Sequence, residues 1–343
     1  MQIVILYKNR CDPECLGTAD TTTWTYQEAT GLLTEKTYAD SKSTSYTYTA
    51  DGKLATRTWS RGVVTTYSYD LADNLTGISY SDLTPAVGFT YNRLGQQFTV
   101  TDAVGSRTFG YNDKFQLTSE TISGIYNKVI SRSYDALGRS SGMNIGTEYG
   151  VGYGYDNLGR LSTVTSGTDT FTYSYMANSN LISNITYPNG ISASKSYEPN
   201  RDLVTSIENK YGTTTVSKYD YSNDDLGRRT AMGKSGTAFT QADTIAYGYN
   251  DRSEITSAVA QNQATFDYLY NFDLVGNRIT SASTETGTTV TRNYISNNLN
   301  QYTTIDNPAA TPTYDDDGCM TNDGGSWTYS WDGGRTDWFQ LRK

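Results

Sequence analysis

The chain has 343 residues and a formal net charge of −9 at pH 7. Nucleic-acid backbones are bound by clustered Lys and Arg, so this acidic balance and the lack of a basic patch argue against a nucleic-acid partner. The sequence contains no histidine. This excludes Ser-His-Asp and Cys-His catalysis and every metal site that uses an imidazole ligand.

The N-terminal segment carries a short apolar run at residues 3–6. A secretory leader needs about 7–15 apolar residues after a basic start, and a transmembrane helix needs about 20. Neither pattern is seen in this sequence, so we expect no signal peptide in this chain and no membrane span. Cys11 and Cys15 could pair with each other, or one of them with Cys319. An odd number of cysteines without a repeated spacing defines no disulfide framework.

The sequence is unusually rich in tyrosine, with 30 Tyr, and has 31 Gly against only 6 Pro. Tyr and the abundant Thr favour a half-buried pleated surface, and Gly favours tight turns. The composition therefore predicts an all-β chain. Aromatic residues recur with a period near 21, which indicates tandem repeats. The fifteen anchors are Tyr26, Tyr48, Tyr69, Tyr91, Tyr111, Tyr134, Tyr155, Tyr175, Tyr197, Tyr221, Tyr249, Tyr270, Tyr294, Tyr314 and Trp331.

Each repeat reads as a hairpin. The residue two before the anchor is aromatic in most units, so the incoming strand carries an aromatic stripe on one face. After the anchor comes Asp-x-x-Gly, in which Asp accepts backbone hydrogen bonds and Gly takes a positive φ in the bulge that closes the hairpin. An apolar residue six positions after the anchor, such as Leu161, opens the outgoing strand. One rung of a parallel β-helix would have a similar period, but turn residues lying directly between two alternating runs favour hairpins.

The turn pattern decays in places. Phe115, Arg201 and Ser253 stand where glycine is expected, and Gly227 and Gly276 are displaced by two residues. We expect these turns to be longer or of another type.

The repeats resemble those of the RHS/YD-repeat family over residues 24–332. The resemblance implies a curved, spiralling antiparallel strip of tandem hairpins that forms part of a hollow shell. Bacterial shells of this kind resemble cocoons around a toxic polypeptide, other members are cell-surface proteins, and carbohydrate binding has been ascribed to the repeats. Two signatures are complete, and we interpret their residues as repeat-defining structural positions: Tyr134, Asp135, Gly138 and Arg139, and Tyr155, Asp156, Gly159 and Arg160.

The sequence also departs from the family pattern. Complete shells end in a core region rich in Gly, Pro, Arg and Tyr that can cleave itself, and no segment here matches it. Residues 1–23 form an atypical N-terminal segment, residues 24–332 the repeat array, and residues 333–343 an unpatterned tail. We therefore expect a truncated fragment that lacks the C-terminal core. Its two ends are expected to stay unpaired and to promote self-association through exposed edge strands.

The acidic residues suggest no catalytic or metal site. Asp315, Asp316, Asp317 and Gly318 invite a calcium interpretation, but an EF-hand loop has acidic ligands at alternate positions and a closing Glu. The Asp-rich repeat turn explains them better, and the same holds for Asp224 and Asp225. Glycoside hydrolysis needs one distinct pair of carboxylates, whereas most aspartates here lie at repeat turns. We expect no enzyme, no cofactor and no metal.

The aromatic stripes and the turn arginines have two interpretations each. Tyrosine faces could stack on sugars, but a stripe in nearly every repeat favours cross-strand packing. Arg139 and Arg160 are expected to lie over neighbouring tyrosines or to pair with turn aspartates. The sequence thus predicts a non-catalytic part of a secreted or cell-surface shell, used for encapsulation or presentation of a toxin or effector. Its partners would be further shell segments or an enclosed polypeptide. The alternative is a module that binds carbohydrate or a cell surface.

Overall fold

The computed structural model describes residues 2–7, 20–262, 267–285, 287–334 and 337–341. Within these ranges the chain forms 31 strands and no helix, which confirms the all-β prediction. No helix that could span a membrane is found in the described part of the chain. Cys11 and Cys15 lie outside the described residues.

Twenty-seven strands form one sheet. Each strand pairs antiparallel with the next along the chain, so the sheet is a continuous meander of hairpins and not a parallel β-helix. The first strands are β1 (Gln2–Tyr7), β2 (Asp20–Tyr26), β3 (Leu33–Thr37), β4 (Ser43–Tyr48), β5 (Leu54–Thr58), β6 (Val64–Tyr69), β7 (Leu75–Tyr80), β8 (Val87–Tyr91), β9 (Gln97–Asp102), β10 (Gly105–Tyr111), β11 (Leu117–Gly124), β12 (Lys128–Tyr134) and β13 (Ser140–Ile145). The sheet continues with β14 (Tyr149–Tyr155), β15 (Leu161–Ser166), β16 (Asp169–Tyr175), β17 (Ile182–Thr186), β18 (Ile191–Tyr197), β19 (Val204–Tyr211), β20 (Thr214–Asn223), β21 (Arg229–Ser235), β22 (Asp243–Tyr249), β23 (Ile255–Ala260), β24 (Asp267–Phe272), β25 (Arg278–Glu285), β26 (Thr288–Ser296) and β27 (Tyr302–Ile305).

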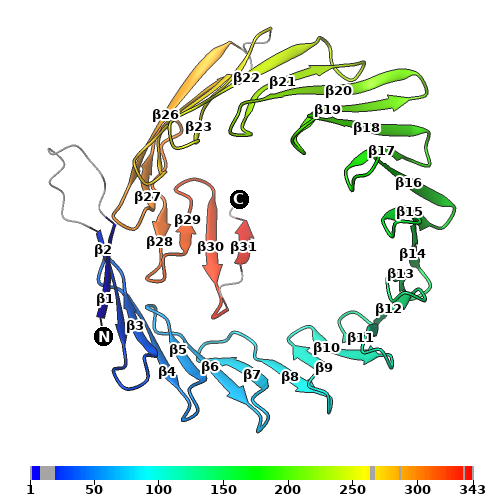
Figure 1. The fold of residues 1–343 in the computed structure, drawn as a ribbon. Coiled ribbons are helices and arrows are strands. Elements are labelled where there is room, and N and C mark those ends of the chain that lie inside the picture. Colours follow the sequence, from blue (N-terminus) through cyan, green and yellow to red (C-terminus); the bar gives the residue numbers. More distant parts are fainter. Residues whose placement is uncertain (1, 8–19, 263–266, 286, 335–336, 342–343) are drawn as a thin grey trace.

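The large sheet curves into a ring, and a second, four-stranded sheet lies inside it (Figure 1). This inner sheet consists of β28 (Thr313–Tyr314), β29 (Met320–Asn322), β30 (Trp327–Trp331) and β31 (Asp337–Leu341). Two segments that did not fit the repeat pattern are therefore part of sheets. Strand β1 adds one strand before the first repeat, and β31, within residues 333–343, pairs with β30.

The wall of the ring is one sheet thick. The chain exposes 21359 Å², whereas a compact monomer of this mass would expose about 14,000 Å². Among the described residues the buried hydrophobic side chains are Trp59, Val100, Ala193 and Ala260. The sheet therefore lacks a conventional core, and its stability depends on contacts between neighbouring hairpins.

Alternate connections of the meander lie at opposite edges of the strip. The turns that follow the anchors form one edge, which we call the YD rim. The turns between an outgoing strand and the next incoming strand form the other edge, which we call the return rim. At the YD rim the register shifts at the anchor, which in most turns pairs with the residue six positions later, as between Tyr134 and Ser140 and between Tyr155 and Leu161. The expected bulge is therefore present.

The turn glycines adopt the expected conformation, with φ of 82° at Gly138 and 81° at Gly159. The turns without glycine follow two routes. Phe115 and Ser253 themselves take positive φ values of 62° and 64°, so these turns keep the common form, against expectation. At Arg201 the turn is one residue longer, because the Glu198 amide donates to the carbonyl of Leu203.

Three anchors were assigned two residues too early. Asn223, Phe272 and Ser296 occupy the anchor position, in place of Tyr221, Tyr270 and Tyr294. The turns at Gly227 and Gly276 are therefore of the common type, with φ of 79° and 97°. The aromatic stripe misled the assignment, because side chains two residues apart share a strand face.

The glycine at the turn tip generates a stability prediction. Gly159→Val should lower the free energy of unfolding by about 1–2 kcal/mol or more, because a Cβ opposes the left-handed conformation. An added Cβ at Gly159 would meet its nearest atom, Nη1 of Arg139, only at 3.5 Å, so the cost comes from the backbone. Ser253→Gly should act in the opposite direction, by up to about 1 kcal/mol. Urea unfolding followed by circular dichroism measures both.

Ser166→Val is the control, because Ser166 lies at the end of a strand and should accept valine with little change. Equal urea midpoints for Gly159→Val and Ser166→Val would contradict the assigned turn geometry.

Candidate functional site

An aspartate organises the YD turns that carry the complete signature. In the Asp135 turn one carboxylate oxygen accepts the amides of Leu137 and Arg139, both at 2.9 Å. The other oxygen accepts Nε of Arg139 at 2.7 Å. Asp156 makes the same set of bonds with Leu158 and Arg160. The carboxylate thus satisfies backbone donors and fixes the orientation of the guanidinium.

The turn carboxylates remain charged at neutral pH. Burial acts to raise the pKa of Asp135 and of Asp156. The hydrogen bonds that each receives from the backbone and guanidinium of the following arginine outweigh burial, so each pKa lies below the usual aspartate value. The aspartate–arginine pairs are therefore intact at physiological pH.

The turn arginine reaches the next repeat. The guanidinium carbon of Arg139 lies 4.2 Å from the ring centre of Tyr155, and that of Arg160 lies 4.2 Å from the ring centre of Tyr175. Each arginine therefore pairs with its own turn aspartate and also covers the anchor of the following hairpin. A cation–π contact of this kind contributes about 0.5–1 kcal/mol at an exposed site.

Glutamine replaces arginine at this position in other turns and makes an equivalent contact. Nε2 of Gln116 donates to the carbonyl of Gly138 at 2.8 Å, and Nε2 of Gln96 donates to the carbonyl of Phe115 at 3.1 Å. The side chain five residues after the anchor thus links successive turns along the YD rim. This ladder of contacts between turns was not predicted from the sequence, although long polar residues recur at this position of the repeats.

The anchor hydroxyl makes a second link between hairpins. Tyr155 Oη donates to the carbonyl of Ser140 at 2.7 Å, and Tyr175 Oη donates to that of Leu161 at 2.6 Å. In each case the acceptor is the first residue of the outgoing strand of the preceding hairpin. The same bond is made by Tyr48, Tyr69, Tyr91, Tyr111, Tyr134, Tyr197, Tyr249 and Tyr314.

The two rims meet where the inner sheet lies against the first hairpins. Arg61, in the return turn between β5 and β6, receives the YD turn that joins β28 to β29. Its Nε lies 2.7 Å from a carboxylate oxygen of Asp317, and its backbone amide donates to the other oxygen at 3.2 Å. The Asp317 side chain is fully buried. Arg61 also donates to the carbonyls of Trp331, at 2.9 Å, and Asp332.

Neighbouring turns extend this contact on both sides. Lys42 pairs with Asp316 at 2.9 Å in the preceding return turn. In the following one, the Gly333 amide donates to Oγ1 of Thr84 at 2.5 Å. Three consecutive YD turns thus lie on three consecutive return turns about 250–270 residues earlier in the chain. The ends were expected to stay unpaired. In the described part of the chain no ladder joins a strand of the first hairpins to one of the last, and the two ends meet through turns.

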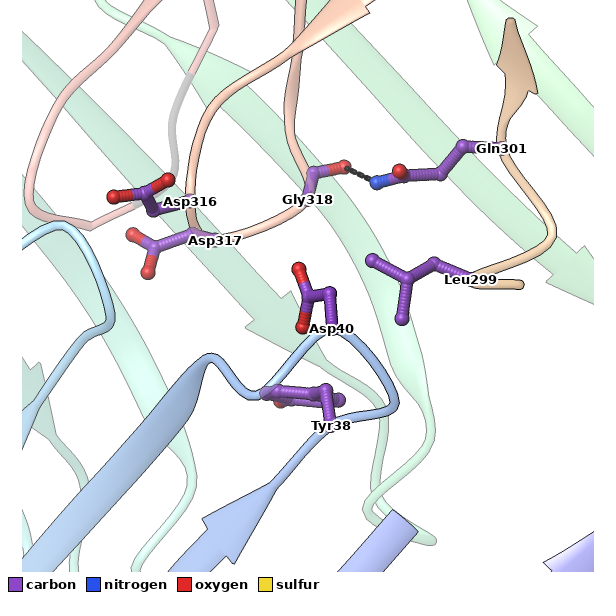
Figure 2. A pocket seen from close by; sticks show the side chains of 7 residues that line it. All are labelled: Tyr38, Asp40, Leu299, Gln301, Asp316, Asp317 and Gly318. Carbon is purple, nitrogen blue, oxygen red and sulfur yellow. Dashed lines mark hydrogen bonds between the residues drawn. The ribbon is translucent and has the colours of Figure 1, made fainter. Parts of the chain in front are cut away.

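A cleft of about 300 Å³ lies in this contact (Figure 2). On one side it is lined by Tyr38 and Asp40 of the return rim. On the other it is lined by Leu299 and Gln301 of one YD turn and by the acidic turn that includes Gly318. Nε2 of Gln301 donates to the Gly318 carbonyl at 3.3 Å, so the turn ladder continues from the large sheet into the inner one.

The carboxylates of the acidic turn, residues 315–318, make structural contacts within the protein. Asp315 is the turn aspartate and accepts the amides of Asp317 and Cys319 at 3.0 and 2.8 Å. Asp316 and Asp317 pair with Lys42 and Arg61, so cations of the protein already occupy the carboxylates. Within the described ranges, no group of three or more acidic or cysteine side chains is arranged to hold a metal ion.

Fold and site together define a one-layer array of coupled β-hairpins that curves back on itself. A family model described as Teneurin YD-shell matches residues 82–205. The fold is also that of a crystal structure of TcdB2-TccC3-Cdc42, with 15% identity and a TM-score of 0.77 over 95% of this chain and 21% of that one. A structure of the Photorhabdus luminescens Tc holotoxin pore gives 15% identity and a TM-score of 0.74 over 96% and 21%. The match to the YD-shell model and the shared fold confirm the resemblance to RHS/YD repeats seen in the sequence.

The chain spans about a fifth of the length of these solved chains. No curated protein matches the sequence.

The anchor hydroxyl can be tested by removing one oxygen atom. Tyr155→Phe should lower the free energy of unfolding by about 0.5–1.5 kcal/mol, because the ring stays while its bond to Ser140 is lost. Tyr126→Phe is the matched control, since Tyr126 is exposed at the return rim. Urea midpoints measure both variants, and equal midpoints would refute a role for the anchor hydroxyl.

The contact between the last YD turns and the first return turns, which we call the inner contact, can be tested at Arg61. Arg61→Ala leaves the Asp317 carboxylate buried without its guanidinium partner, a change that costs about 3–5 kcal/mol where a buried pair is broken. Amide exchange followed by mass spectrometry should quicken in β28–β30 and stay unchanged in β14–β15. Arg107→Ala is the control, because the Arg107–Asp102 pair is partly exposed and lies away from the contact. Unchanged exchange in β28–β30 would show that Arg61 does not hold the inner sheet.

Proposed function

We propose that this chain is a non-catalytic wall segment of an RHS/YD shell that encapsulates or presents another polypeptide, such as a toxin or effector. The observation that carries the proposal is the full turn of the strip, which brings β28–β31 inside the ring formed by the earlier strands (Figure 1). A one-layer wall that curves in this way separates the space inside the ring from the space outside it. Its partners would be further shell segments and the enclosed polypeptide, in an extracellular or cell-surface setting.

The disposition of polar groups supports a structural role. The turn carboxylates are engaged by backbone amides and arginines, as at Asp135, Asp156 and Asp224. Repetition of one arrangement along the chain is typical of a scaffold, whereas catalysis requires a distinct site. One of the similar structures is described as a Tc holotoxin pore, which is compatible with a toxin-associated shell.

A protection experiment tests encapsulation. An unfolded reporter peptide joined to the C-terminus, after β31, should begin inside the ring, whereas the same reporter joined to the N-terminus, before β1, begins on the wall. We expect a protease to cleave the C-terminal reporter several-fold more slowly. Circular dichroism of both fusions would show that the β-sheet is retained. Equal cleavage rates would refute encapsulation by this chain and leave the fold unaffected.

A second candidate function is carbohydrate binding, which one non-repeated feature favours. The connection between β21 and β22 is long and folds back onto β20, where the Ala238 amide donates to the Val216 carbonyl at 2.8 Å. It places Phe239 edge-on against Tyr219, with ring centres 5.8 Å apart. These rings, with Tyr247, Tyr268 and other side chains, line an apolar groove of about 360 Å³. Aromatic faces flanked by hydroxyl groups suit the rings of sugars.

A glycan array tests this candidate. If the groove binds sugar, Phe239→Ala should lose the signal, because it removes one wall of the groove. Tyr126→Ala, which removes an exposed aromatic side chain elsewhere, should retain it. A wild-type chain that retains no glycan, or a signal equally strong in Phe239→Ala, would exclude the groove as a carbohydrate site.

A further inference from the structure

The contact between the two rims joins two different surfaces. It places YD turns of the last hairpins on return turns of the first hairpins, so the two surfaces are different. An acidic turn meets Lys42 and Arg61, and Leu299 at a YD turn tip lines a cleft with Tyr38 of a return turn. A contact between two unlike surfaces is heterologous. Between separate molecules it produces open chains unless a rotation closes it.

The covered part of each rim is short compared with the strip. Leu299 is half-buried where it lies over the return rim. At the equivalent turn-tip position elsewhere, leucine is 78% exposed at residue Leu137 and 74% exposed at Leu158 and Leu226. The same residue type at the same place in the turn is thus covered where a return rim lies against it and open where none does.

The return rim also carries exposed apolar side chains. Beyond the contact, Ile125 and Tyr126 are 70% and 63% exposed, and Tyr211 is 62% exposed. Rows of exposed apolar side chains of this kind mark interaction surfaces. Both rims therefore continue, uncovered, the two surfaces that meet in the inner contact.

We propose that the YD rim of one copy of this chain docks on the return rim of a second copy, in the manner of the inner contact. The turn-tip leucines, including Leu137, Leu158 and Leu226, would pack on the apolar return turns of the neighbour. Because the surfaces are unlike, the docked pair retains one free YD rim on one copy and one free return rim on the other, and further copies add head to tail. The surface of association is then the row of turns, and not the exposed edge strands that the sequence predicts.

Two complementary variants test the proposal. The first carries Leu137→Asp, Leu158→Asp and Leu226→Asp and blocks the YD rim. The second carries Ile125→Asp, Tyr126→Asp and Tyr211→Asp and blocks the return rim. Light scattering should show a mass that rises with concentration for the wild-type chain and a monomer for each variant alone. An equimolar mixture of the two variants should form a 1:1 complex, because one unblocked rim of each kind remains.

Leu269→Asp is the matched control. Leu269 is 49% exposed in the middle of β24, away from both rims, so this variant should associate as the wild-type chain does. Circular dichroism and urea midpoints check that the variants are folded, and serine replaces aspartate at the same positions if a variant is not. A wild-type chain that stays monomeric over a hundredfold range of concentration would overturn the proposal. So would rim variants that still associate, or two monomeric variants that do not combine.

Discussion

The structure depends on the coupling of each hairpin to the next. A one-layer sheet cannot bury a core, and a single hairpin is at best marginally stable in water. The anchor hydroxyl donates to the preceding hairpin, as Tyr155 does to Ser140, and the turn arginine covers the following anchor, as Arg139 does Tyr155. Together with the backbone ladder, these bonds make stability a sum of nearest-neighbour terms, as in other repeat arrays.

The same turn explains the curvature. Each incoming strand carries a bulge at its anchor, always at the YD rim, and a β-bulge bends its strand and increases the local twist. Small bends of one sense accumulate along the meander until the strip completes a turn. The late YD turns then meet the early return turns, where Arg61 receives Asp317. A structural repeat thus produces a ring-shaped wall without any residue dedicated to that shape.

Functional specificity has to come from features that the repeat does not share. Two are present in the described residues. One is the inner contact at Arg61, which combines rims from opposite ends of the strip. The other is the long β21–β22 connection, which places Phe239 over the sheet and forms an aromatic groove. Elsewhere the regularity of the array favours a scaffold, and its two unlike rims supply surfaces for further copies or windings.

The sequence by itself determined the hairpin, because the residues that form it lie within six positions of each other. Asp135 and Gly138 specify their turn through local hydrogen bonds and a positive φ. In the next hairpin, Tyr155 and Leu161 mark the two strand ends that flank the turn. It misplaced the anchors near Gly227 and Gly276, since aromatic residues two apart share a face. Only the tertiary structure decided the pairing of β1 and the contact of Arg61 with Asp317, 256 residues away. That contact depends on the summed bending of all the intervening hairpins, which no local pattern encodes.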